Sequence, residues 1–122
     1  MNGMKISPEA QQTLIELQTF QQQMQTVILQ KESLSIQNME IEKALEELEK
    51  TEHDEVFKTV GPVLIKSTRK ALTEELKEKQ ETIDVRLKSL QKQEDRIKEK
   101  LKESQEKFQK LMTAEESESV AV

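Results

Sequence analysis

Residues 56–66 read VFKTVGPVLIK and separate two long segments, residues 9–50 and 69–114, that contain neither glycine nor proline. On both sides of Gly61-Pro62 the residues are mostly β-branched, aromatic or long aliphatic, which is typical of short strands joined by a turn. Each arm is too short for an independent helix. The stretch therefore predicts a β-hairpin over about residues 55–67. Its turn type stays open, because Pro62 excludes the two-residue turn that needs positive φ at both central positions.

The predicted hairpin carries apolar side chains on both faces. Alternation along the strands places six of them on two faces, with Val56, Val60, Val63 and Ile65 on one and Phe57 and Leu64 on the other. An isolated two-stranded hairpin is marginally stable in water, and its open edges and apolar faces need other chains to cover them. We therefore expect an oligomer subunit that assembles through these six hairpin residues.

The segment before the hairpin has the start signal and the periodicity of a helix from about residue 8 to residue 50. Ser7 can cap this helix, and Pro8 suits its first position because the missing N–H has no helical partner there. With Leu17 at position a of a heptad, the d positions that follow are all apolar: Phe20, Val27, Leu34, Ile41 and Leu48. This seam predicts coiled-coil packing.

The segment after the hairpin, about residues 69–114, carries a matching seam with d positions at Leu76, Ile83, Leu90, Ile97, Ser104 and Leu111. In an antiparallel pair with d facing d, Ile41 meets Ile83, and the residue numbers of every such layer sum to 124. The chain then reverses at Gly61-Pro62, as the hairpin requires. The polar a positions Lys31 and Asn38 either specify register and partner or act as a functional switch.

These patterns predict a mainly α fold, a long antiparallel two-helix coiled coil joined by a short β-hairpin through which subunits assemble. Residues 1–122 are expected to form a single domain, with a flexible acidic tail at residues 115–122.

Composition limits the class of protein. Of the 122 residues, 35% are charged and only three are aromatic, a mixture too polar for a thick globular core and typical of long helices. Without cysteine the chain has no disulfide and no thiolate metal site. The sequence contains neither a signal peptide nor an apolar run long enough to span a bilayer, so we expect a cytoplasmic protein without a membrane partner.

Charge and motif searches indicate binding rather than catalysis. The net charge is −5, and lysines in the second helix alternate with acids instead of forming a positive stripe, so no nucleic-acid partner is expected. His53-Asp54 is interpreted as a solvated linker, because no nucleophile, metal-ligand cluster or glycine-rich loop accompanies it. We expect no enzyme activity, no catalytic residue, no metal site and no cofactor.

The ends of the seam far from the hairpin differ from its middle. There Phe20 faces Ser104 and Thr13 faces Leu111, so large side chains meet small ones and packing is expected to loosen. Further apolar residues lie off the seam: Leu14, Ile15, Ile28, Leu29 and Met112. Two interpretations stay open. The ends are frayed or packed on a neighbour, or they form an adaptable apolar surface that binds unstructured polypeptide.

The order of helix, VFKTVGPVLIK and helix, with glutamine abundant in the first helix and Glu and Lys in the second, resembles prefoldin beta subunits of the archaeal type. The resemblance covers nearly the whole chain. It implies an ATP-independent chaperone built from two alpha and four beta subunits, whose hairpins form a central double barrel. It further implies that unfolded client proteins are held at the distal coiled-coil tips and delivered to a group II chaperonin.

Carried onto this sequence, the resemblance assigns three sets of residues. The client-binding set, called the tip residues below, is Leu14, Leu17, Phe20, Met24, Phe108, Leu111 and Met112. The barrel set is the six hairpin residues. The set that contacts the chaperonin is Glu115, Glu116 and Glu118. A structural coiled-coil scaffold or adaptor without client-holding activity is the alternative, although a spacer needs only a turn where this chain has a hairpin.

Overall fold

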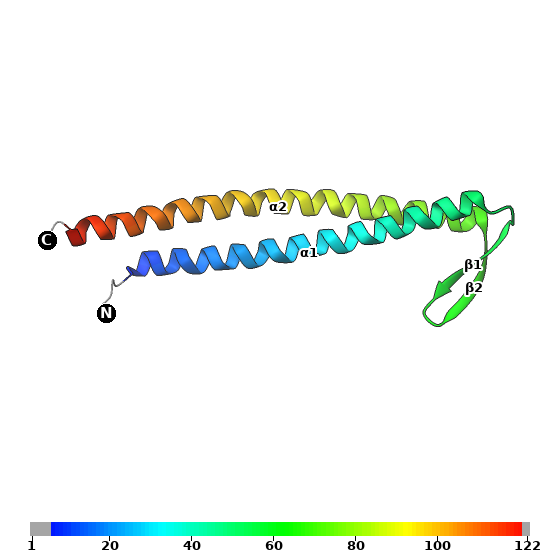
Figure 1. Cartoon of the computed structure of the whole chain (residues 1–122), viewed down its shortest axis with the longest axis horizontal. Coiled ribbons are helices and arrows are strands. Elements are labelled where there is room, and N and C mark those ends of the chain that lie inside the picture. The colour runs from blue at the N-terminus through cyan, green and yellow to red at the C-terminus, as the bar shows by residue number, and fades with distance from the viewer. Residues whose placement is uncertain (1–5, 121–122) are drawn as a thin grey trace. The chain divides into compact units, whose positions relative to one another are not determined.

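The computed structural model describes the backbone of residues 6–120 and the side chains of residues 6–114. In chain order the elements are helix α1 (Pro8–Lys50), strand β1 (Glu55–Val60), strand β2 (Val63–Thr68) and helix α2 (Arg69–Val120) (Figure 1). The predicted architecture of two long helices with an antiparallel hairpin between them is confirmed. Barrel formation requires further chains and stays a prediction.

Both helices begin at side-chain caps. The Ser7 hydroxyl oxygen accepts a hydrogen bond from the Ala10 N–H at 3.1 Å, and α1 starts at Pro8. The Thr68 hydroxyl oxygen accepts one from the Ala71 N–H, also at 3.1 Å. Because Thr68 is both the last residue of β2 and the cap of α2, the second strand passes into its helix without a linker.

Helix α2 extends to Val120, beyond the predicted end near Ala114 and into the segment expected to be a tail. Residues 115–120 contain neither glycine nor proline, so nothing in the sequence terminates the helix there.

The residues group into two compact units, each with its own stretch of the seam. In the unit Gln30–Leu90, antiparallel segments of α1 and α2 bury only predicted d positions: Leu34, Ile41, Leu48, Ile83 and Leu90. Across this seam the Asn38 amide Nδ2 donates to Asp84 at 3.0 Å and Gln80 Nε2 donates to Glu42 at 2.7 Å. Both contacts lie within one helical turn of the predicted pairing, which supports the d-to-d register.

The second unit comprises residues 6–29 and 91–120 of the described chain. Its buried positions include Leu17 and Val27 but also three small residues, Ala10, Thr13 and Ser104. The Lys100 ammonium lies 5.8 Å from the centroid of the Phe20 ring, which aligns α1 and α2 in the same antiparallel sense.

The hairpin closes through a two-residue turn. Val60 pairs with Val63, leaving Gly61 and Pro62 as the central residues, and Gly61 has φ of +57°. Proline at the second position fixes a negative φ there. Positive φ at the first central position alone is the pattern of a type II′ turn, whose twist matches that of paired strands. The hairpin turn, whose type the sequence did not determine, is therefore a type II′ turn.

We expect Gly61→Ala to open the hairpin, because an L-residue at this φ costs about 1–2 kcal/mol. A Cβ there would meet no atom within 4 Å, so the cost comes from the backbone alone. Amide hydrogen exchange should show roughly 5- to 30-fold lower protection in β1 and β2, with α2 amides unchanged. Pro62→Ala is the control, because alanine adopts the φ of proline and the loss should be smaller. Equal protection in wild type and Gly61→Ala would contradict the turn assignment.

Candidate functional site

The hairpin presents apolar side chains on both faces, grouped as the strand alternation predicts. The pairs Val60 with Val63 and Lys58 with Ile65 share one face. Phe57 and Leu64 lie on the other and are 56% and 69% exposed. Of the six hairpin residues, five are exposed and Val56 is half-buried. A hairpin this apolar gains stability only when another surface covers it.

Charged side chains on the hairpin are paired. The Lys66 ammonium lies 3.4 Å from a Glu55 carboxylate oxygen on the Phe57 face. On the opposite face Lys58 reaches both carboxylate oxygens of Glu75 in α2, each at 3.2 Å. Neutralised charge at the rim and exposed apolar groups at the centre are the pattern of a protein interface.

The tip residues all fall in the unit of residues 6–29 and 91–120. Leu17 is buried at 8% exposure, and the other six are half-buried: Leu14, Phe20, Met24, Phe108, Leu111 and Met112. The structure therefore brings all seven into one unit, but it leaves Leu17 inside the seam and only the remaining six reachable from solvent.

The small residues of this unit are packed closely. Thr13 is 1% exposed and its hydroxyl donates to the Glu9 carbonyl at 2.9 Å, while Ser104 is 6% exposed. The small member of each large-to-small layer is thus covered, and the expected loosening of these layers stays a prediction. Phe20 and Leu111, the large members of the same layers, are half-exposed.

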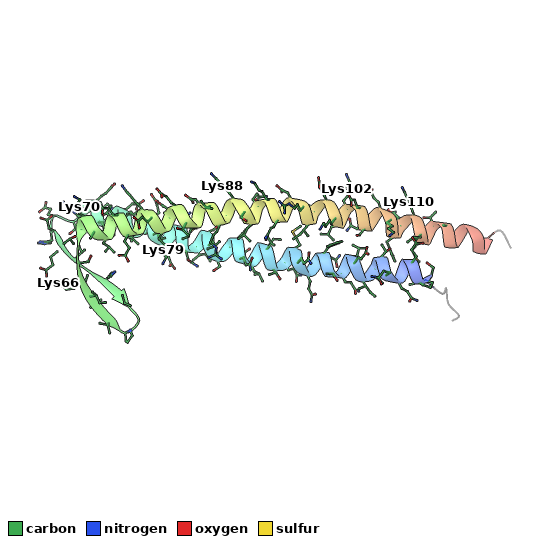
Figure 2. All side chains as sticks on the ribbon, turned by 180° about the vertical axis from the view of Figure 1, so that it is seen from behind. Lys66, Lys70, Lys79, Lys88, Lys102 and Lys110 are labelled. Carbon is green, nitrogen blue, oxygen red and sulfur yellow. The ribbon has the colours of Figure 1, made fainter. Side chains whose placement is uncertain are left out.

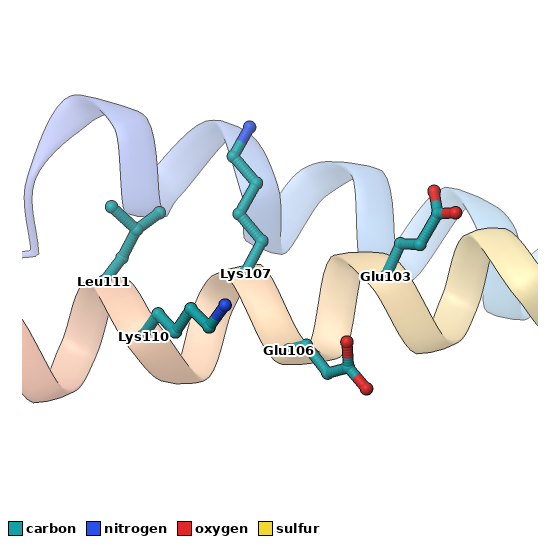
Figure 3. Close-up of a pocket in the computed structure, with 5 residues that line it drawn as sticks. All are labelled: Glu103, Glu106, Lys107, Lys110 and Leu111. Carbon is teal, nitrogen blue, oxygen red and sulfur yellow. The ribbon is translucent and has the colours of Figure 1, made fainter.

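A shallow hollow of 340 Å³ lies beside Leu111 on α2, lined also by Glu103, Glu106, Lys107 and Lys110. Figure 3 shows Leu111, Lys107 and Glu103 on the side of α2 that faces α1. The apolar edge of the seam is thus bordered by charges of both signs, and the Lys100 ammonium covers the Phe20 ring.

Several exposed apolar residues lie away from the seam. Ile15, Ile28 and Leu29 are exposed, as their off-seam positions predict. The sequence reasoning missed three others, Ile36, Met39 and Val85. The signal was present for Ile36 and Val85, because both occupy heptad position f, which points away from the partner helix.

The charged side chains of the described residues are distributed along the helices. The labelled lysines of α2 in Figure 2 are spaced along the helix rather than gathered into a patch. Within residues 6–114, whose side chains the structure describes, no cluster of three His, Cys, Asp or Glu side chains is placed to hold a metal. Over the same range neither helix is apolar enough for long enough to cross a membrane. His53 is exposed in the linker between α1 and β1.

Comparison with known proteins identifies the family of this chain. The sequence profile of prefoldin subunits matches residues 11–115. The chain is similar to the prefoldin subunit beta of Thermococcus onnurineus, with 47% identity over 105 residues that cover 85% of this chain and 90% of the relative. The chain belongs to the prefoldin family. A more distant prefoldin subunit beta, from Archaeoglobus fulgidus, is 38% identical over 110 residues.

The prefoldin fold is also seen in a solved structure. The crystal structure of the prefoldin beta subunit from a Thermococcus strain superposes with a TM-score of 0.78 at 41% identity, covering 88% of this chain and 96% of that chain. Prefoldins are chaperone subunits, and membership of the family implies that this chain assembles with other prefoldin subunits. That this assembly uses the six hairpin residues stays a prediction.

The burial pattern separates one tip residue from its neighbours. We expect Leu17→Ala to lower the free energy of unfolding by about 2–3 kcal/mol, because it removes a buried side chain from the seam. Ile15→Ala, two residues away on the exposed face, should change it by less than about 0.5 kcal/mol. Urea unfolding followed by circular dichroism measures both. Equal losses in the two variants would mean that Leu17 is not part of the seam.

Proposed function

We propose that this prefoldin subunit captures unfolded client proteins at its tip and hands them to a group II chaperonin without using ATP. The observation that carries the proposal is the half-exposure of Phe20, Met24 and Leu111 beside a seam closed by small residues. Such side chains are held in place by the helices, yet each keeps part of its apolar surface in contact with water.

Weak contacts at one tip become effective when several tips act together. A single half-exposed phenylalanine or leucine offers little area, but tips joined in one assembly raise the effective concentration of binding sites around a client. Flexible Met24 and Met112 adapt to different client side chains. Because each contact is weak, the client leaves without an input of chemical energy.

Assembly is proposed to proceed through the six hairpin residues, in a hexamer of two alpha and four beta subunits with a central double barrel. Edges of β1 and β2 gain hydrogen-bonding partners in such a barrel, and the apolar faces leave water. A scaffold without client-holding activity would use the same hairpin but would make no use of the half-exposed tip side chains.

The proposal also includes a contact with the chaperonin and a cellular compartment. Contact with the chaperonin is assigned to Glu115, Glu116 and Glu118, which lie beyond the residues whose side chains the structure describes. Their carboxylates would meet a basic surface on the chaperonin. The activity is one of binding rather than catalysis, exercised in the cytoplasm.

Client capture is tested by Phe20→Ser combined with Leu111→Ser in hexamers formed with an alpha-type partner. We expect the variant to need several-fold more hexamer to suppress aggregation of a denatured client without nucleotide, because two apolar contacts are lost at each beta tip. Light scattering measures aggregation, and native mass confirms the hexamer. Val85→Ser, an exposed apolar residue in the other unit, is the control and should match wild type. Undiminished suppression by intact variant hexamers would refute the tip assignment.

Assembly is tested by Val60→Asp combined with Ile65→Asp, which places two carboxylates on one apolar face of the hairpin. Burying an unpaired charge costs several kcal/mol, so hexamers should not form. Val85→Asp combined with Ser89→Asp adds the same charge on the exposed face of α2 and should leave assembly unchanged. Sedimentation measures the outcome. A hexameric profile for the hairpin variant would exclude this face from the interface.

A further inference from the structure

The hairpin is joined to the two helices in different ways. β2 continues directly into α2 at Thr68 and Arg69, while β1 is joined to α1 by residues 51–54. Rotation about the Thr68–Arg69 junction would turn the whole hairpin relative to α2. The four-residue linker between α1 and β1 is long enough to permit this rotation. A hairpin free to swing would lose this freedom on assembly, and ordering costs affinity.

Arg69 holds the linker against the ends of both helices. Its guanidinium Nη1 donates to the Thr51 carbonyl at 2.8 Å, and its Nη2 lies 3.6 Å from an Asp54 carboxylate oxygen. Its backbone N–H donates to the Asp54 carbonyl at 2.8 Å. Because Thr51 immediately follows α1, the cation also lies at the negative end of that helix. One residue thus joins the end of α1, the linker and the start of α2.

Lys58 forms a second connection, farther from the junction. It is a half-buried residue of β1, and its ammonium spans to both carboxylate oxygens of Glu75 in α2 at 3.2 Å. Glu75 lies about 9 Å along the helix from Arg69, at a rise of about 1.5 Å per residue. Two contacts separated by this distance restrict rotation in a way that one contact at the junction cannot.

We propose that Lys58, Glu75 and Arg69 form a strut that fixes the angle of the hairpin to α2 in the free subunit, so that the barrel edges are oriented before subunits meet. These three are positioning residues for assembly, since their contacts are made within the chain and the six hairpin residues supply the interface. The inference rests on the proposed assembly through the hairpin.

The hairpin itself provides an internal comparison. Lys66 is paired with Glu55 at 3.4 Å, so this ion pair lies within the hairpin and does not connect it to α2. A charge reversal at Lys66 changes the charge of the hairpin by the same amount as one at Lys58, but it cannot alter the angle through Glu75. The two lysines therefore separate an effect of orientation from an effect of charge.

The orientation is measured directly in the free chain. Because the sequence has no cysteine, spin labels can be attached at Leu64→Cys in the hairpin and Val85→Cys in α2, both exposed. We expect a narrow distance distribution in the labelled parent chain, a broader one with Lys58→Glu or Glu75→Lys, and a narrow one again when both reversals are combined. Lys66→Glu should leave the distribution narrow, and Arg69→Met should broaden it. A distribution indifferent to Lys58→Glu and Arg69→Met would overturn the strut.

Assembly with an alpha-type partner provides the functional measurement. For a partly exposed ion pair, each single reversal at Lys58 or Glu75 should raise the half-assembly concentration by roughly 1.5- to 5-fold per hairpin. The combined reversal should return it to within about twofold of wild type, while Glu75→Lys should not rescue Lys66→Glu. Helix content and the thermal midpoint of the free chain should stay unchanged. If the combined reversal does not restore assembly, the positioning role is overturned. If the unmodified chain itself fails to assemble, the proposed assembly is refuted, and the distance measurement in the free chain then decides whether the strut exists.

Discussion

Every other feature depends on the narrowness of the seam between α1 and α2. Two helices in contact share one stripe of side chains, and in the unit Gln30–Leu90 that stripe consists of the d positions Leu34, Ile41, Leu48, Ile83 and Leu90. Burying one such side chain stabilises a fold by about 1.5–3 kcal/mol. The pairing of the helices is therefore secured by few residues, and apolar residues outside the stripe remain at the surface.

The hairpin is the extreme case of apolar surface left uncovered. Its register puts apolar pairs on both faces, so a rotation of the hairpin onto its own helices would cover one face and leave the other in water. Leu64, at 69% exposure, lies on the face opposite Lys58, the residue that anchors the hairpin to α2. In the proposed assembly, the other prefoldin subunits would cover the hairpin faces that this chain leaves exposed.

Periodicity and local chemistry made much of this fold predictable. The start of α1 at Pro8 follows from Ser7, the d seam follows from a heptad with few exceptions, and the faces of the hairpin follow from strand alternation. Features that depend on three-dimensional fit were not predictable. The burial of Thr13 and Ser104 depends on how the surrounding side chains cover them, and the contact of Arg69 with Thr51 requires the path of the linker. The turn type needed the observed φ of Gly61.

The same limit applies to the candidate site. A heptad identifies which residues face the partner helix, but it does not state how far each side chain is covered, so Leu17 and Phe20 were assigned together although only Phe20 is half-exposed. The half-exposed ring of Phe20 is also partly covered within its own unit. The Lys100 ammonium above its ring supplies a cation–π contact of about 0.5–1 kcal/mol at an exposed site. That contact covers part of the ring, and in the proposed client capture it would be weak enough for an apolar side chain to displace.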